Sequence, residues 1–142
     1  MQRINIQERV PEAYKAMFGL EKFIAGSTID AELQELVRLR ASVINGCKLC
    51  IGMHSDAAKK IGVNGQKIAA IKEWQNSSLF SSSERAVLRM TDAITLISVD
   101  GLPDDIYQKV SSFFEEDEVA QIIMIIVTIN AWNRLGVSMA EE

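Results

Sequence analysis

Apolar residues recur at helical spacing through most of this 142-residue chain, and no stretch shows the strict alternation of a half-buried strand. We therefore predict an all-α fold of about seven helices, in a single domain that covers residues 1–142. Residues 1–10 are expected to form an extended lead-in. The predicted helices cover residues 11–26, 27–45, 47–60, 64–74, 81–97, 103–114 and 117–135.

Several helix boundaries are marked by residues that cap helix ends. Pro11 suits the first position of a helix, where its missing N–H is not needed. Residues 27–30 (Ser-Thr-Ile-Asp) and 81–84 (Ser-Ser-Ser-Glu) both resemble the capping box, in which side chains satisfy the free backbone N–H groups. Gly46 is a helix stop, since glycine takes the left-handed conformation past a helix end without strain. Asn64 is a further candidate cap.

The segment from Val119 to Ile129 is apolar on nearly every side of its predicted helix. Such a helix is either central to the core or shared with another subunit. The run is shorter than the stretch of about 20 apolar residues that spans a bilayer, so no membrane association is expected.

The composition narrows the classes of partner. Hydrophobic residues make up 48% of the chain, which is enough for a packed core, and the formal net charge is −4. No basic stripe is present to neutralise phosphates, so nucleic acid is not expected as a partner. The N-terminal sequence MQRINIQERV lacks the apolar core of a signal peptide. We expect a cytoplasmic protein, in which a C-x-x-C pair is more often redox-active or metal-binding than structural.

The reactive side chains gather between Glu35 and His54. This stretch contains both cysteines of the chain, Cys47 and Cys50, and its only histidine. If a helix begins at about Cys47, the two cysteines and His54 lie at positions i, i+3 and i+7 and share one face. The thiols then lie in the first helical turn, where the macrodipole and the free N–H groups favour a thiolate and lower the thiol pKa.

The positions of these side chains suggest their chemistry. His54 is one turn from Cys50 and can take its proton, directly or through a water. Glu35 is on the preceding helix and could hold the imidazole in one tautomer, although most helix carboxylates are solvated. The helix dipole alone favours Cys47 as the thiol of lower pKa, whereas the proximity of His54 favours Cys50.

The order of Glu35, eleven residues and then C-x-x-C-x-x-x-H resembles the active-site signature of the alkylhydroperoxidase AhpD-like proteins, in the carboxymuconolactone decarboxylase superfamily. Supporting pieces of the resemblance are residues 38–42 (RLRAS), 83–86 (SERA) and 130–134 (NAWNR), so it covers most of the chain. It implies an AhpD-like helical bundle that assembles as a homo-oligomer, a trimer or a hexamer. Well-known AhpD proteins carry a second histidine between the cysteines, and Leu49 stands there in this chain.

The resemblance also implies a function, that of a thiol-dependent alkylhydroperoxidase with antioxidant, peroxiredoxin-type activity. Cys50 would attack the O–O bond of the peroxide and become a sulfenic acid, and Cys47 would condense with it to a disulfide. Glu35 and His54 would form the proton relay. No cofactor and no metal is expected, and a lipoyl-bearing protein or another dithiol would be the reductant.

Two alternatives from other functional classes stay open. A carboxymuconolactone decarboxylase-like enzyme of aromatic degradation would not need the cysteine pair. A non-enzymatic metal-binding or redox-sensing module could use two Cys, one His and one Glu as a tetrahedral zinc site, although the chain has no second cysteine pair. Trp74 and Trp132 are interpreted as core or interface residues, and Asn130 and Asn133 as residues that bond helix ends.

Overall fold

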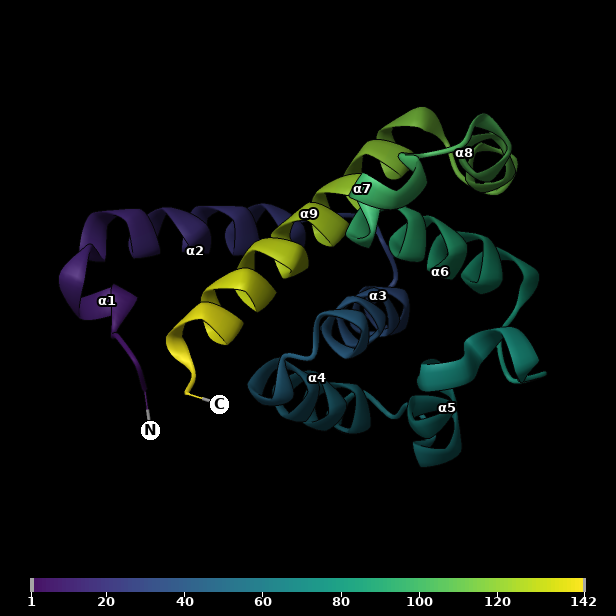
Figure 1. The fold of residues 1–142 in the computed structure, drawn as a ribbon. Helices are drawn as coiled ribbons and strands as arrows, with labels where there is room; N and C mark the ends of the chain where they lie inside the picture. Colours follow the sequence, from purple (N-terminus) through teal and green to yellow (C-terminus); the bar gives the residue numbers. More distant parts are fainter. Residues whose placement is uncertain (1, 142) are drawn as a thin grey trace.

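Helices account for nearly all of the regular structure in the computed structural model, which describes residues 2–141 (Figure 1). Within that range, extended backbone pairs only at one isolated bridge between Gln2 and Ala140. The predicted all-α class is confirmed. In chain order the elements are α1 (Ile6–Arg9), α2 (Pro11–Ala25), α3 (Ala31–Asn45), α4 (Lys48–Lys60), α5 (Gly65–Ala70), the 3₁₀-helix η1 (Ile71–Asn76), α6 (Ser82–Thr95), α7 (Ile97–Asp100), α8 (Asp104–Ser111) and α9 (Glu116–Met139).

The sequence pattern predicts neither α1 nor α7, two helices of four residues each. The predicted extended lead-in over residues 1–10 is wrong from residue 6 onward, while residue 1 lies outside the described residues. Asn5 starts α1 because its side-chain Oδ1 accepts a 3.2 Å hydrogen bond from the Glu8 N–H. Both helices contain no buried residue, so no apolar periodicity marks them in the sequence.

The capping box predicted for residues 81–84 is confirmed at the start of α6. Ser81 Oγ accepts a hydrogen bond of 3.2 Å from the Glu84 N–H, and the Glu84 carboxylate accepts one of 2.8 Å from the Ser81 N–H. Two backbone donors that the first helical turn leaves free are thereby satisfied.

The capping box predicted for residues 27–30 is wrong, because α3 begins only after Asp30. The Asp30 carboxylate caps this helix by accepting a 3.4 Å hydrogen bond from the Leu33 N–H. Ser27 Oγ instead accepts a 3.3 Å hydrogen bond from the Gln34 side chain. Aspartate is as good an N-cap as serine, so local sequence alone did not separate the two choices.

The helix predicted over residues 64–74 is divided into α5 and η1. Asn64 is its cap as predicted, since Asn64 Oδ1 accepts a 2.7 Å hydrogen bond from the Gln66 N–H. The backbone of Glu73 departs from helical geometry, with φ −132° and ψ 48°. The 3₁₀ segment begins at Ile71 and is kinked at Glu73, and Trp74 directly after the kink is buried.

α3 lies at the centre of the molecule and packs against α9, α4 and α6 (Figure 1). Its two apolar sides enter two separate core clusters, one with α2, α6, α8 and α9 and the other with α4, α5, η1 and α6. The first cluster contains Ile24, Ile29, Leu33, Val37, Ala86, Val87, Met90, Ile106, Val110, Val119, Ile122, Ile125 and Ile126. The second contains Leu36, Leu39, Ala58, Val63, Ile68, Ile71, Trp74, Phe80 and Leu88. Because apolar contacts hold α3 on both sides, the side chains it carries toward α4 have fixed positions.

α9 begins and ends close to the predicted positions and extends four residues beyond Leu135, to Met139. Its apolar segment is central to the core, which was one of the two predicted alternatives. The apolar run from Val119 to Ile129 is too short to span a bilayer, but the whole of α9 is, by length and composition alone, long and apolar enough to cross a membrane. A core helix meets the same criterion, and the buried residues of α9 are Val119, Ile122, Ile125, Ile126, Thr128, Ile129, Asn130 and Asn133.

Candidate functional site

The cysteine motif lies at the turn that joins α3 to α4. Gly46 ends α3 in the left-handed conformation, with φ 66°, as the sequence predicts. Cys47 is the N-cap of α4, with extended backbone, and not its first helical residue as predicted. The helix begins one residue later because the Cys47 backbone is extended, with φ −81° and ψ 91°, while its N–H donates to the Ser42 carbonyl at the end of α3 at 3.1 Å. Cys50 therefore lies in the first helical turn, and Cys47 lies just outside it.

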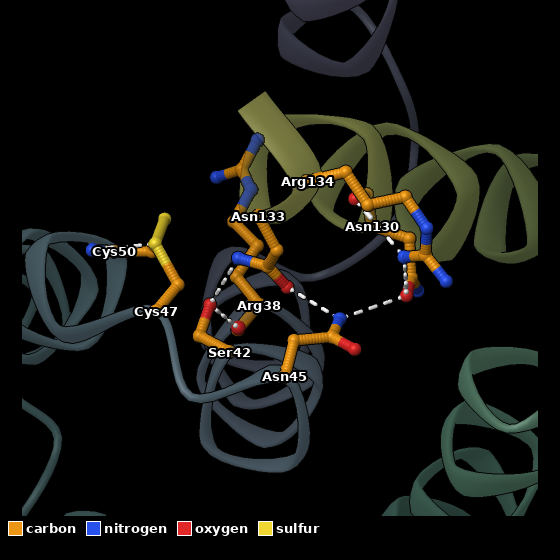
Figure 2. Close-up of a disulfide and its surroundings, with 8 residues drawn as sticks. All are labelled: Arg38, Ser42, Asn45, Cys47, Cys50, Asn130, Asn133 and Arg134. Atoms are coloured by element: carbon orange, nitrogen blue, oxygen red, sulfur yellow. Dashed lines mark hydrogen bonds between the residues drawn. A yellow bond between two sulfur atoms is a disulfide. The ribbon is translucent and has the colours of Figure 1, made fainter. Parts of the chain in front are cut away.

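Cys47 and Cys50 form a disulfide (Figure 2). Both are buried, with exposed fractions of 3% and 7%. Cys47 Sγ also accepts a hydrogen bond of 3.4 Å from the Cys50 N–H, so the capping position offers a backbone donor to the Cys47 sulfur. The expected closeness of the two thiols is thus present in the fold.

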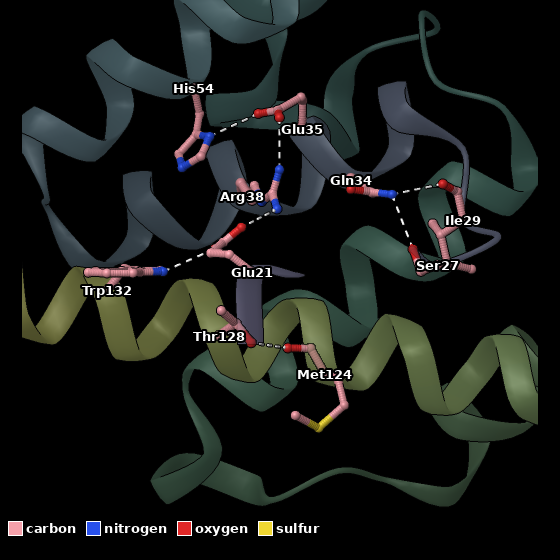
Figure 3. A network of polar contacts seen from close by, with 10 residues as sticks. All are labelled: Glu21, Ser27, Ile29, Gln34, Glu35, Arg38, His54, Met124, Thr128 and Trp132. Carbon is pink, nitrogen blue, oxygen red and sulfur yellow. Dashed lines mark hydrogen bonds and ion pairs between the residues drawn. The ribbon is translucent and has the colours of Figure 1, made fainter. Parts of the chain in front are cut away.

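Glu35 and His54 are in direct contact across the α3–α4 interface. Glu35 Oε2 lies 2.9 Å from His54 Nδ1 (Figure 3). The Glu35 residue is only 9% exposed, so this carboxylate is not the solvated helix acid that most helix glutamates are. The contact fixes the direction of the imidazole and leaves His54 Nε2 free of Glu35.

A chain of polar contacts continues from Glu35 across three further side chains (Figure 3). Arg38 donates from one guanidinium nitrogen to Glu35 Oε1 at 2.9 Å, and from another to Glu21 Oε2 at 3.0 Å. The other Glu21 oxygen accepts a 3.0 Å hydrogen bond from the indole N–H of Trp132. One polar chain therefore ties α2, α3, α4 and α9 together around His54.

The pKa of Glu35 is lowered from its ordinary value by this arrangement. Burial taken alone would raise the pKa, because it disfavours the charged carboxylate. The hydrogen bond and charge of His54, and then the charge and hydrogen bond of Arg38, outweigh that effect. Glu35 is consequently an anion at neutral pH, with one oxygen directed to Nδ1 of His54.

A cavity of about 340 Å³ opens onto Cys50 and His54. Its walls come mainly from α2, α4 and α9 and are largely apolar. Tyr14, Phe18 and Trp132 form an aromatic cluster in it, with ring centroids 5.4 to 5.7 Å apart. The full lining is Tyr14, Phe18, Glu21, Arg38, Leu49, Cys50, Met53, His54, Trp132, Leu135, Gly136 and Met139. A small ligand with an apolar body fits this lining, and its polar end would meet Cys50 and His54.

Gly136 lets α9 approach the disulfide closely. A Cβ atom at this position would lie 2.9 Å from Cys47 Sγ and 3.6 Å from Cys50 Sγ. The first distance is shorter than van der Waals contact, so a side chain at position 136 would displace the sulfur.

A second polar network fixes the turn that carries Cys47 (Figure 2). Asn45 donates to the side-chain oxygens of Asn130 and Asn133, at 2.9 Å each, and Asn133 donates to Ser42 Oγ at 3.0 Å. Ser42 Oγ in turn donates to the Arg38 carbonyl at 2.6 Å. Asn130 and Asn133 therefore bind the end of α3 to α9, close to their predicted role at helix ends.

The described residues do not form the zinc site that was considered as an alternative. No group of three or more His, Cys, Asp or Glu residues is placed to hold a metal ion anywhere in the stretch from residue 2 to residue 141. Glu35 is directed to His54 Nδ1 and Arg38, and the two sulfurs are bonded to each other.

The sequence profile of the Carboxymuconolactone decarboxylase family matches residues 11–93. The chain belongs to this family. The uncharacterized protein YdfG of Bacillus subtilis (strain 168) is 36% identical over 141 residues, which cover 99% of this chain and 96% of YdfG. This carboxymuconolactone decarboxylase family member is thus similar to YdfG over nearly the whole of both chains.

Solved structures extend the family comparison to AhpD-like proteins. The crystal structure of ATU0492 from Agrobacterium tumefaciens, a protein of unknown function suggested to be the antioxidant defence protein AhpD, matches with a TM-score of 0.96 and 35% identity. The match covers 100% of this chain and 97% of ATU0492. The predicted AhpD-like relationship is confirmed.

The debrominase Bmp8 is a second structural relative. Its apo structure matches with a TM-score of 0.81 and 26% identity, over 96% of this chain and 73% of Bmp8. A cysteine-to-alanine variant of Bmp8 in complex with 2,3,4-tribromopyrrole matches with the same TM-score and 25% identity. The solved structures to which this chain is similar therefore include a debrominase.

Sequence reasoning found the cysteines, His54 and Glu35 but missed most of the cavity around them. Tyr14, Phe18 and Glu21 follow one another at i, i+4 and i+7, so they share a face of α2. That spacing could have shown a mixed aromatic and acidic stripe, which is unusual for a face turned to the core. Trp132 lines the cavity as well, and was interpreted only as a packing residue. Gly136 carried no signal beyond being a glycine inside a helix.

Proposed function

We propose that this protein is a thiol-dependent peroxidase of the AhpD type, with Cys47 and Cys50 as its redox-active dithiol. The observation that carries the proposal is the shared cavity, which both Cys50 and His54 line, while Glu35 contacts the Nδ1 atom of the imidazole. A peroxide that enters this cavity meets the sulfur and the proton relay together.

The proposed reaction begins with the reduced protein. His54, assisted by the anionic Glu35, takes the proton of the Cys50 thiol. The Cys50 thiolate attacks one oxygen of the peroxide, the O–O bond breaks, and the leaving alkoxide takes the proton from His54. Cys50 is then a sulfenic acid. Cys47 attacks its sulfur, the S–S bond forms, and the hydroxide leaves as water with the proton of the Cys47 thiol.

The apolar lining favours organic hydroperoxides over hydrogen peroxide as substrates. The aromatic cluster of Tyr14, Phe18 and Trp132 offers contacts to an alkyl or aryl group that hydrogen peroxide cannot use. Leu49 adds a further apolar residue where the resemblance leads one to expect a second histidine, so His54 serves the relay without a second imidazole.

The remaining components of the proposal are a dithiol reductant, such as a lipoyl-bearing protein, and a homo-oligomeric protein in the cytoplasm. The dithiol is needed because each turnover leaves a disulfide, and a second thiol on the reductant releases the mixed disulfide that forms first.

The proposal is tested by peroxide consumption with dihydrolipoamide as reductant. Wild type should turn over an organic hydroperoxide, and the Cys47→Ser and Cys50→Ser variants should each lose sustained turnover, because neither can complete the disulfide cycle. Wild type blocked with N-ethylmaleimide is the matched control for thiol dependence. Turnover that survives in both variants would contradict the proposal, because the reaction would then not depend on the dithiol.

A second candidate is the reductive removal of halogen from a small aromatic ring, suggested by the likeness to Bmp8 and by the aromatic cavity beside Cys50. The dithiol would supply two electrons, so that the carbon–bromine bond becomes carbon–hydrogen, bromide leaves and the disulfide forms. Release of bromide from 2,3,4-tribromopyrrole by the reduced protein tests it. No release over that of a Cys50→Ser control excludes it.

A further inference from the structure

The two cysteines of the disulfide line two different cavities. Cys50 lines the apolar cavity described above. Cys47 lines a second cavity of about 390 Å³, between the start of α4, the end of α9 and the N-terminal segment. Neither cavity contains both cysteines among its lining residues.

The second cavity has a different chemical character from the first. Arg3 and Lys48 place two cationic side chains in its walls, with Glu141 as the one carboxylate among its lining residues. The aromatic cluster, His54 and Arg38 are all confined to the first cavity. A thiolate is therefore better matched by the cavity at Cys47, and an apolar substrate by the cavity at Cys50.

Leu49 and Gly136 line both cavities, so the two cavities lie next to each other on either side of the disulfide. The missing Cβ of Gly136 brings the α9 backbone to within contact of the sulfurs. Each cavity thus has one of the two cysteines in its lining, Cys47 in the second and Cys50 in the first.

We propose that the dithiol reductant enters through the second cavity and attacks Cys47, while the oxidising substrate enters through the first cavity and reacts with Cys50. This assignment rests on the proposed thiol-dependent function and adds to it a separate site for the reductant. The ligand class of that site is a dithiol in its thiolate form, met by the charges of Arg3 and Lys48.

The exchange step reduces the protein disulfide by two electrons. The reductant thiolate forms a bond to Cys47 Sγ, the Cys47–Cys50 bond breaks, and Cys50 leaves as a thiolate beside His54. The second thiol of the reductant loses its proton to solvent and attacks the reductant sulfur of the mixed disulfide. Cys47 leaves as a thiolate, and the reductant departs as a disulfide that has given two electrons to the protein.

The rival assignment has its own structural basis. The Cys50 N–H that points to Cys47 Sγ would stabilise Cys47 as the leaving thiolate if the reductant attacked Cys50 instead. That attack would have to pass through the apolar cavity, away from Arg3 and Lys48. The two routes leave the incoming thiol on different cysteines, and this difference is measurable.

The deciding experiment uses the oxidised wild-type protein and 2-mercaptoethanol as a monothiol probe. After a short exposure, N-ethylmaleimide traps the newly released cysteine. Trypsin cleaves after Lys48 and so places Cys47 and Cys50 on different peptides, which mass spectrometry can score separately. We expect mercaptoethanol on Cys47 and maleimide on Cys50. The reverse distribution, or equal amounts of both, would overturn the inference.

A second measurement tests whether a bulky side chain in the second cavity slows the reduction of the disulfide. Val137 lines it and is 46% exposed on α9, so Val137→Trp places bulk in the path to Cys47 without filling the core. Val127, 43% exposed on the same helix and in neither lining, gives the matched control Val127→Trp. We expect the tryptophan at position 137 to slow disulfide reduction by dithiothreitol by about tenfold or more, and that at position 127 to leave it within about twofold; a tenfold change is 1.4 kcal/mol in a barrier. Equal rates in the two variants, or a disulfide that the dithiol does not open, would also overturn the inference.

Both measurements read the opening of a disulfide and use no peroxide. If the protein does not consume peroxide but mercaptoethanol is found on Cys47, the peroxidase proposal is refuted and the entry of the reductant at Cys47 is supported. If the protein consumes peroxide but mercaptoethanol is found on Cys50, the peroxidase proposal is supported and the entry of the reductant at Cys47 is refuted.

Discussion

Glu35 is the residue on which the electrostatics of the site depend. It accepts from Arg38 with one oxygen and contacts His54 with the other. Its pKa is lowered because these partners outweigh the opposing effect of burial. A carboxylate with a depressed pKa adds stability above its unfolded-state pKa, and this stability is lost as the pH falls through the folded-state pKa. The Glu35 contribution is therefore present at neutral pH and disappears in acid.

Replacing Glu35 with glutamine removes the charge and keeps the size. We expect Glu35→Gln to slow the reaction of Cys50 with peroxide by about 10²-fold near neutral pH, which is a usual scale for a lost acid–base contribution. The deficit should shrink at alkaline pH, where Cys50 ionises without help. Rate-versus-pH profiles of thiol oxidation measure this, with Glu12→Gln, an exposed acid in α2, as the control. Superimposable profiles of wild type and Glu35→Gln would remove Glu35 from the relay.

Gly136 has no room for a side chain, because a Cβ atom there would lie too close to the Cys47 sulfur. An alanine here would gain about 1 kcal/mol of helix propensity but would overpack against Cys47 Sγ, at a typical cost of about 1–3 kcal/mol. In the reduced protein the thiol can rotate away, so Gly136→Ala should lower the Tm of the oxidised form relative to the reduced form. Gly19→Ala on α2, where nothing lies within 4 Å of the new Cβ, should stabilise both forms alike. Equal effects of Gly136→Ala on the two forms would contradict the close approach.

At the scale of elements, Lys67 links three helices through one ammonium group. From α5 it donates to Glu84 on α6, at 2.9 and 3.0 Å, and to Glu32 on α3 at 3.0 Å. Burial would lower the Lys67 pKa, but the hydrogen bonds and charges of Glu84 and Glu32 outweigh it and raise the pKa. The Glu84 pKa is lowered, because its hydrogen bonds with Ser81 and Lys67 and the Lys67 charge outweigh burial. The link is thus fully charged through the neutral range.

Lys67→Met should lower the free energy of unfolding by about 1–3 kcal/mol, the scale for hydrogen bonds to charged groups. The raised Lys67 pKa makes its contribution complete below the unfolded-state pKa of Lys67 and lost as the pH rises through the folded value. The lowered Glu84 pKa makes its contribution complete above the unfolded-state pKa of Glu84 and lost as the pH falls. Urea unfolding at several pH values measures the effect, with Lys15→Met on α2 as the control. A loss that does not fade at the acid and alkaline ends would point to packing instead.

The elements were predictable where capping residues and apolar periodicity agree. Ser81, Asn64 and Gly46 mark helix boundaries because their side chains or backbone conformations act within one turn of the chain. The one-turn helices α1 and α7 were not predictable, because they bury no residue and so leave no apolar periodicity. The kink at Glu73 was not predictable from the sequence either, because it lies beside Trp74, which is buried in the folded protein.

The residues of the candidate site were also predictable only where they lie close together in the sequence. Cys47, Cys50 and His54 are close in sequence, so their spacing alone brings them together. Trp132 and Glu21 are 111 positions apart, and their hydrogen bond exists only because α2 packs against α9. No local pattern connects such residues, and the lining of the cavity therefore had to come from the fold.

At the scale of the whole molecule, apolar side chains remain exposed on several elements. Around α7, the residues Ile97 and Val99 are 58% and 77% exposed, and Leu49 and Met53 are exposed at the mouth of the apolar cavity. Covering such surface in a second copy would stabilise an assembly. We expect a homo-oligomer, with a trimer or a hexamer implied by the family resemblance. Light scattering that gives a mass near 15.8 kDa at micromolar concentration would contradict this.

The most direct test of the account asks which sulfur reacts with peroxide. Reduced Cys47→Ser and Cys50→Ser proteins are each treated with one equivalent of an organic hydroperoxide and a dimedone-type reagent, and the sulfenic acid adduct is measured by mass spectrometry. Cys50 shares its cavity with His54, so Cys47→Ser should carry most of the adduct, on Cys50, and Cys50→Ser should carry little. An adduct formed mainly on Cys47 in the Cys50→Ser protein would contradict the account, because the helix N-terminus and not the Glu35–His54 relay would then activate the thiol.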